Sequence, residues 1–169
     1  MLNSTPATYT SGEALTSAKL NAEIRDAFTG LQSAWQAWSP ELTASTTSPT
    51  LGSGSTSGRY QRVGKDVHFE GRVSLSGACT FGAGTWYLSL PIANTASGAW
   101  MNGVVLVYPG AGSWVQGWLR PNGSAKCTLY VPNTATTALL SQVSSTSTPG
   151  GTAWAAGTQI QFWALYESA

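Results

Sequence analysis

The feature that most constrains the fold is a change of residue pattern at Pro40. Before Pro40, apolar residues recur at alternating spacings of four and three, which is typical of an amphipathic helix. Residues 41–169 are rich in Gly, Ser, Thr, Trp and Val and carry almost no helical pattern. A short helix that cannot bury its own apolar stripe, joined to a β-domain, is typical of fibrous and oligomeric surface proteins. The sequence therefore predicts an N-terminal arm and helix over 1–40 and a β-domain over 41–169.

The predicted helix runs from Thr16, a suitable N-cap residue, to Trp38, and Ser39-Pro40 ends it because proline disfavours helical geometry before it. Its stripe has heptad spacing and consists of Leu20, Ile24, Ala27, Leu31, Ala34 and Trp38. Fewer than three heptads are short for an independent coiled coil. The stripe is open to another copy of the chain, to the chain's own β-domain or to a different protein. We favour self-association, although the spacing does not decide between two and three helices.

The composition excludes several classes of function. Only 9% of the residues are charged, against about 25% in an average globular protein, and the net charge is +1. We therefore expect no binding to nucleic acid or to a membrane surface. No apolar run is long enough to span a membrane, and residues 1–10 do not look like a signal peptide.

The region after Pro40 changes to a period of two. Strands are predicted at 59–63, 67–75, 85–90, 103–108, 113–120, 125–131, 139–143 and 159–166. Two hairpin turns are predicted, at Gly64-Lys65-Asp66 and, more strongly, at Asn122-Gly123. Many short strands with no helix between them predict an antiparallel β-sandwich, jelly-roll-like in type. The low-complexity segment 44–58 is interpreted as an extended crossing with an edge strand, a free linker being the alternative.

The residues that could carry catalysis are few. His68 is the only histidine, and it shares a strand face with Glu70 and Arg72, so the three could form an acid–base row. A solvated charged stripe is the interpretation we favour, because no nucleophile motif accompanies the row. Beyond Glu41 at its first position, the β-domain holds only three acidic side chains, Asp66, Glu70 and Glu167, so a glycosidase pair is not expected.

No metal site or cofactor is predicted either. The chain has no zinc or calcium motif, no phosphate loop and no dinucleotide fingerprint. Cys79 and Cys127 belong to no CxxC motif; the sequence leaves a disulfide between them open but favours two small buried apolar residues. We therefore predict a protein that is not an enzyme.

The aromatic content is high, with eight tryptophans, six of them after residue 85. Trp114 and Trp118 share one strand parity and Val115 and Leu119 the other, so both indoles are expected to face outward if the aliphatic pair faces the core. By the same argument Trp163 and Leu165 face outward. Indole faces bordered by amides and hydroxyls suit a sugar ring. The candidate glycan contacts are Trp100, Tyr108, Trp114 and Trp118. Burial of the indoles in the core or between subunits is the alternative.

Two segments of the sequence resemble segments of small tail-fibre and minor tail proteins of bacteriophages. The first is TSGEALTSAKLNAEIRDAF at 10–28, and the second is LTASTTSPTLGSGSTSGRYQRVGKDVHFEGRVSL at 42–75, followed by GTWYLSLP at 84–91. Together they cover about a third of the chain. The resemblance implies a homotrimeric component of the virion surface, assembled in the bacterial cytoplasm without a signal peptide. It carries over no catalytic residues.

These expectations combine into one hypothesis with alternatives. Residues 1–40 would trimerise or dock onto other virion proteins, and the β-domain would attach to a glycan of the host surface. The first alternative is a capsid decoration or head-fibre protein that docks through its N-terminus. The second is a wall-active enzyme using Glu70 or His68.

Overall fold

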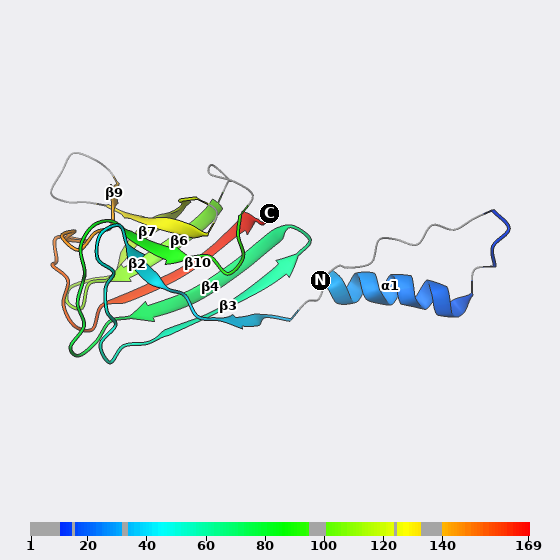
Figure 1. The fold of residues 1–169 in the computed structure, drawn as a ribbon, viewed down its shortest axis with the longest axis horizontal. Coiled ribbons are helices and arrows are strands. Elements are labelled where there is room, and N and C mark those ends of the chain that lie inside the picture. Colours follow the sequence, from blue (N-terminus) through cyan, green and yellow to red (C-terminus); the bar gives the residue numbers. More distant parts are fainter. Residues whose placement is uncertain (1–10, 15, 32–33, 95–100, 124, 133–139) are drawn as a thin grey trace.

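The computed structural model describes residues 11–14, 16–31, 34–94, 101–123, 125–132 and 140–169. The fold is mainly β, in agreement with the sequence, and its described strands form one curled antiparallel sheet (Figure 1). The strands are β1 (Gln36–Trp38), β2 (Leu42–Ala44), β3 (Thr56–Val63), β4 (Asp66–Ser74), β5 (Trp86–Ser89), β6 (Met101–Tyr108), β7 (Val115–Pro121), β8 (Lys126–Val131), β9 (Ser141–Gln142) and β10 (Gln159–Glu167). One helix, α1 (Ser17–Leu31), precedes them.

The order of the strands brings distant parts of the chain together. Along the sheet the order is β1-β3-β4-β10-β6-β7-β8-β5-β2, and β9 pairs with β8. The C-terminal strand β10 therefore lies in the middle, between β4 and β6. The two ends of this order, β1 and β2, are consecutive in the chain, so the short connection 39–41 links the two ends of the curled sheet.

Most of the predicted strands are confirmed, with ends shifted by a few residues. The first hairpin turn is shorter than expected, because Asp66 pairs with Val63 and leaves only Gly64 and Lys65 in the loop. The second hairpin joins β7 to β8, as Asn122-Gly123 predicts. Asn122 supports this turn in two ways: its backbone N–H donates to the Lys126 carbonyl (2.8 Å) and its side-chain amide donates to Thr128 (3.0 Å).

The core lies on the concave side of the curled sheet, where alternate residues of each strand meet. On β4 the predicted alternation is confirmed: Val67, Phe69 and Val73 are buried, whereas His68 and Arg72 are exposed. The remaining buried apolar residues of this cluster are Leu42, Leu75, Trp86, Leu88, Leu90, Val105, Val107, Leu119, Cys127, Leu129, Val131, Val143, Ile160, Phe162, Ala164 and Tyr166. On β10 the same alternation buries Ile160, Phe162 and Ala164, which agrees with the outward direction predicted for Trp163 and Leu165.

The helix is shorter than its heptad pattern predicts. The Thr16 hydroxyl accepts a hydrogen bond from the Lys19 backbone N–H (3.3 Å), which confirms the predicted N-cap. The prediction of helix as far as Trp38 is wrong: α1 ends at Leu31, Ala34 lies outside it, and Trp38 belongs to β1.

The exposed stripe on α1 is short. Leu20, Ile24 and Phe28, spaced four apart, are exposed. Figure 1 shows α1 beyond the end of the sheet, with its C-terminal end nearer to the strands and its N-terminal end farther from them. The side chains of Ala27 and Leu31 lie outside what the structure describes. The helix is too short and too polar to span a membrane, and no other helix occurs among the described residues.

Trp38 leaves the helical pattern because the core accommodates its ring. Its indole packs edge-on against Phe69 (centroids 5.6 Å apart) and Phe162 (6.0 Å). In the sheet, Trp38 pairs with Gly58, Gly58 with Gly71, and Gly71 with Phe162, so two strands separate the two rings. The rings can meet because neither glycine has a side chain: a Cβ on Gly58 would lie 2.9 Å from the indole, and one on Gly71 would lie 2.8 Å from the Phe162 ring.

The Ser/Thr-rich segment 44–58 crosses the domain surface in an extended form, as predicted. It starts at the last residue of β2, Ala44, and ends in the first residues of β3. Between them, three isolated bridges join it to the chain at 76–83, namely Thr47 with Ala83, Thr50 with Thr80, and Gly52 with Ser76. Thr50 and Thr80 also join their hydroxyls at 2.9 Å. The alternative of a free linker is therefore wrong.

A second aromatic group attaches the long connections to the sheet. Trp86 is completely buried, and its ring stacks on Trp154 (4.6 Å) and Phe81 (6.4 Å). Both indoles donate to backbone carbonyls, Trp86 to Phe81 (3.1 Å) and Trp154 to Ser144 (2.8 Å). Two of the six tryptophans of the β-domain, Trp86 and Trp154, are therefore packed against the core.

The two cysteines are free thiols. Cys127 is fully buried, and this desolvation raises the pKa of its thiol to about 12 despite a backbone hydrogen bond involving Leu88. The thiol therefore remains protonated and unreactive near neutral pH. Cys79 is only half-buried. The expectation of two buried apolar residues is confirmed for Cys127 alone.

Candidate functional site

The outer face of the sheet carries a row of side chains that come from several neighbouring strands. Trp118 on β7 pairs with Val104 on β6, and Val104 pairs with Trp163 on β10. The row continues from Trp163 to Glu70 on β4 and from Glu70 to Arg59 on β3. Trp118 is 47% exposed and Trp163 is 49% exposed, so two indoles stand on rigid strands with about half of their surface in water. Because large apolar side chains are normally covered, this row is a candidate contact surface.

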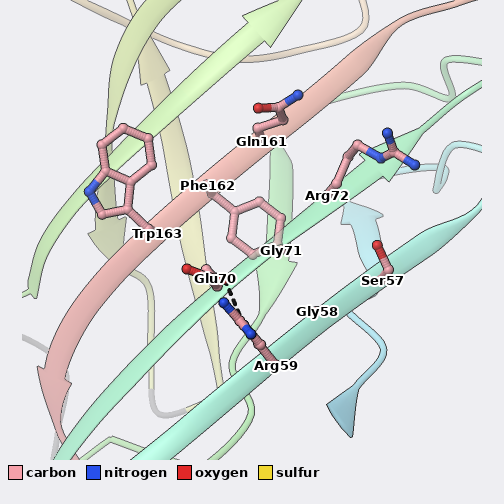
Figure 2. A pocket seen from close by; sticks show the side chains of 9 residues that line it. All are labelled: Ser57, Gly58, Arg59, Glu70, Gly71, Arg72, Gln161, Phe162 and Trp163. Carbon is pink, nitrogen blue, oxygen red and sulfur yellow. Dashed lines mark hydrogen bonds and ion pairs between the residues drawn. The ribbon is translucent and has the colours of Figure 1, made fainter. Parts of the chain in front are cut away.

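A hollow of about 490 Å³ lies beside Trp163. Six outward-facing side chains surround it, two from each of β3, β4 and β10: Ser57, Arg59, Glu70, Arg72, Gln161 and Trp163. Figure 2 shows the Trp163 indole on one side of Glu70 and the Arg59 side chain on the other. Gly58, Gly71 and Phe162 complete the lining. The volume falls within the range of about 300–1,000 Å³ that is usual for small-molecule sites.

The polar side chains of this hollow differ in their partners. Arg59 Nε donates to Glu70 Oε1 at 2.7 Å, so the one carboxylate of the hollow is paired with a guanidinium. Among the described residues, the side chains of Arg72, Gln161 and Ser57 have no hydrogen-bond or ion-pair partner. They are therefore free to bind a ligand, and the three ionisable side chains together carry one positive charge.

A second hollow of about 370 Å³ lies further along the same face. Glu70 and Trp163 also line it, so these two residues stand between the two hollows. Trp35, whose ring lies 4.7 Å below the Arg59 guanidinium, borders it together with the remaining lining residues His68, Phe69, Asn102, Val104, Ala164 and Leu165. Two neighbouring hollows therefore lie on the outer face, the first over β3, β4 and β10 and the second over β4, β10 and β6, and Glu70 and Trp163 line both.

The structure brings only part of the predicted glycan contacts together. The rings of Tyr108 and Trp114 lie 5.5 Å apart, and Trp114 is 45% exposed. Trp118 is separate from this pair: its partner Val104 lies four residues from Tyr108 on β6, about 13 Å along the strand. Trp100 lies outside the described residues. The outward direction predicted for Trp114, Trp118, Trp163 and Leu165 is confirmed, whereas a contact with glycan remains a prediction.

The row of His68, Glu70 and Arg72 does share one face, as predicted. Glu70 is bound by Arg59 from the neighbouring strand, an interaction that the sequence does not indicate. Within the described part of the chain, no three His, Cys, Asp or Glu side chains are grouped so as to hold a metal ion. The hollow therefore offers an aromatic face, guanidinium groups, an amide and a hydroxyl, which are groups suited to binding.

Sequence reasoning missed the hollow although it found some of its residues. Trp163 was expected to face outward, but nothing placed it opposite Glu70, because β4 and β10 are almost one hundred residues apart in the chain. The only local signal was the alternation of polar and apolar residues on each strand. Comparison with protein-family models, with curated proteins and with solved structures found no match for this chain.

Proposed function

We propose that this protein is a non-enzymatic surface protein of a bacteriophage virion, of tail-fibre or minor-tail type, that attaches to a glycan of the host surface. The observation that carries the proposal is the pair of half-exposed indoles, Trp118 and Trp163, on the outer face of the sheet. An indole on a strand is held in place before binding, so little conformational entropy is lost when a sugar ring stacks on it. The polar side chains beside Trp163 can bind the hydroxyl groups of that sugar.

The virion setting is supported by the sequence phrases at 10–28 and 42–75, which resemble phage tail proteins. The finer architecture belongs to the same proposal: a jelly-roll-like sandwich, trimeric through its N-terminal helix. Several weak glycan sites on one particle would bind a cell surface far more strongly than a single site.

Glycan attachment predicts that Trp118→Ala/Trp163→Ala loses binding. We expect the full-length wild-type chain to bind a subset of bacterial surface glycans on an array and the double variant to bind them at least about tenfold more weakly, because stacking surface is lost from both indoles. Tyr87→Ala is the matched control, since Tyr87 lies on β5, away from this row. Equal binding by the double variant and the wild type, with circular dichroism unchanged, would contradict a role for these indoles.

The exposed stripe of α1 favours assembly through the helix. Leu20, Ile24 and Phe28 lie on one side of α1 at spacings of four and are 42%, 49% and 60% exposed. A helix of this length is marginal in water by itself, so covering the stripe would also stabilise the helix. The same stripe suits docking onto a capsid or tube protein, which is the second candidate function.

Substituting the stripe separates these two candidates. If α1 trimerises the chain, light scattering should give a trimer for the wild type and a monomer for Ile24→Glu/Phe28→Glu, because a charge in an apolar helix interface is strongly unfavourable. Asn21→Glu, at another exposed position of α1, is the control and should leave the mass unchanged. A monomeric wild type would instead favour docking onto a different virion protein.

A further inference from the structure

The hollow beside Trp163 has an uneven distribution of charge that restricts its ligand. Arg59 and Glu70 form an ion pair at 2.7 Å and so largely cancel each other's charge. Arg72 is exposed and, among the described residues, has neither an ion-pair nor a hydrogen-bond partner. The hollow therefore presents one uncompensated guanidinium, which binds an oxyanion through two parallel hydrogen bonds better than any other side chain does.

The neighbours of Arg72 can complete the binding of an anion. The sheet register places Gln161 on one side of Arg72 and Ser57 on the other, and all three side chains face the hollow. Within the part of the chain that the structure describes, the Gln161 amide and the Ser57 hydroxyl have no hydrogen-bond partner, so both can donate to a ligand. A carboxylate at this position would thus meet donors from three adjacent strands.

The aromatic side of the hollow lies next to the side chains that would bind the anion. Trp163 and Gln161 are two residues apart on β10, so their side chains leave the same face about 7 Å from each other. One pyranose ring that carries a carboxylate spans this distance, with its ring against the indole and its carboxylate at Arg72. A plain anion would not use the indole, and a neutral sugar would leave the guanidinium unpaired.

We propose, on the basis of the proposed function, that this hollow binds an acidic sugar residue of the host glycan. Trp163 stacks on the pyranose ring, Arg72 binds its carboxylate, and Gln161 and Ser57 donate hydrogen bonds to it. Arg59 holds Glu70 and thereby prevents that carboxylate from repelling the ligand. The proposal names both the chemical class of the ligand and the residue that selects it.

The test uses the full-length, isotope-labelled chain and follows the Trp163 indole N–H and the Arg72 Nε–H by NMR. The probes are glucuronic, galacturonic and N-acetylneuraminic acids, the neutral sugars glucose, galactose and N-acetylmannosamine, and sodium acetate and inorganic phosphate as plain anions. We expect at least one acidic sugar to shift both resonances and to bind about tenfold more tightly than its neutral counterpart, because a charge-assisted pair is added.

Two variants identify the selecting residue. Arg72→Gln should remove the preference for the acidic sugar, whereas Arg120→Gln, which changes the net charge equally on β7, should retain it. Equal binding of acidic and neutral sugars would overturn the inference and leave glycan attachment standing. Equal binding of acetate or phosphate without a shift of Trp163 would reduce the hollow to an anion site and overturn it too. If neither these sugars nor the glycan array gave any binding, the proposed function itself would fail.

Discussion

Trp86→Ala is expected to lower the free energy of unfolding by about 3–5 kcal/mol, the usual loss for a large aromatic side chain removed from a core. Trp86 is fully buried and stacks on Trp154 at 4.6 Å and on Phe81 at 6.4 Å. Its indole also donates to the Phe81 carbonyl at 3.1 Å. Alanine would leave a large cavity and would separate two long connections from the sheet. Denaturation in guanidinium chloride, at one protein concentration throughout, measures the loss.

Two further variants make this result specific. Trp86→Phe keeps part of the stack but loses the hydrogen bond to Phe81, so it should cost less than Trp86→Ala. Trp118→Ala removes the same side chain from the outer face, where it is 47% exposed, and should lower stability clearly less than Trp86→Ala does, because about half of this indole is already in water. A loss below about 1 kcal/mol for Trp86→Ala would mean that the stack does not hold the connections in place.

The strands could be predicted because each carries its own alternation. On β4 and β10 the inward residues are apolar, and the outward residues are polar or aromatic except Leu165, so a local pattern was enough to assign both faces. The hairpin at Asn122-Gly123 is also local, since its turn residues and both strands are contiguous. Strand order is not local: nothing in the sequence indicates that β10 lies between β4 and β6.

The candidate site could not be predicted for the same reason. Arg59, Glu70 and Trp163 come from three strands and meet only through the register of the sheet. A shift of one residue in the pairing of β10 would turn Trp163 from the outer face into the core. The predicted contacts, Trp100, Tyr108, Trp114 and Trp118, all come from one stretch of the chain, and Tyr108 and Trp114 do lie together (5.5 Å). Trp163 was left out, because only the register of the sheet places it beside Glu70.

The error at Trp38 shows how tertiary packing overrides a local pattern. The heptad spacing continues from Leu20 to Trp38 without a break. The local signal against a longer helix is Gly30, which disfavours helical structure beside Leu31, where the helix ends. Burial of an indole against Phe69 and Phe162 outweighs what one more helical turn would contribute. Gly58 and Gly71 are the sequence signal for this packing. They interrupt two otherwise regular strands and leave space for an aromatic side chain from another strand.

Gly71→Val is therefore expected to destabilise the fold by about 3 kcal/mol, although valine normally favours a strand. A Cβ on Gly71 would lie 2.8 Å from the Phe162 ring and 2.7 Å from the Ser57 carbonyl oxygen, so the ring and the neighbouring strand must both move. Arg72→Val, at the next position of β4 but facing outward, is the matched control and should cost no more than about 0.5 kcal/mol. Denaturant unfolding of the two variants and the wild type gives both values.

A double-mutant cycle tests whether the Phe162 ring is the cause. Phe162→Leu alone should destabilise the core, because its contacts with Trp38 (6.0 Å) and Phe69 (6.0 Å) are lost. In the Gly71→Val background the same substitution should cost less, since a smaller side chain leaves room for valine, and the two losses should be less than additive by about 1 kcal/mol. Additive losses would mean that the Ser57 carbonyl alone excludes a side chain at position 71. Glycine would then be required at position 71 because β3 and β4 must pair closely. The contact between Trp38 and Phe162 would follow from that requirement and would not be the cause of it.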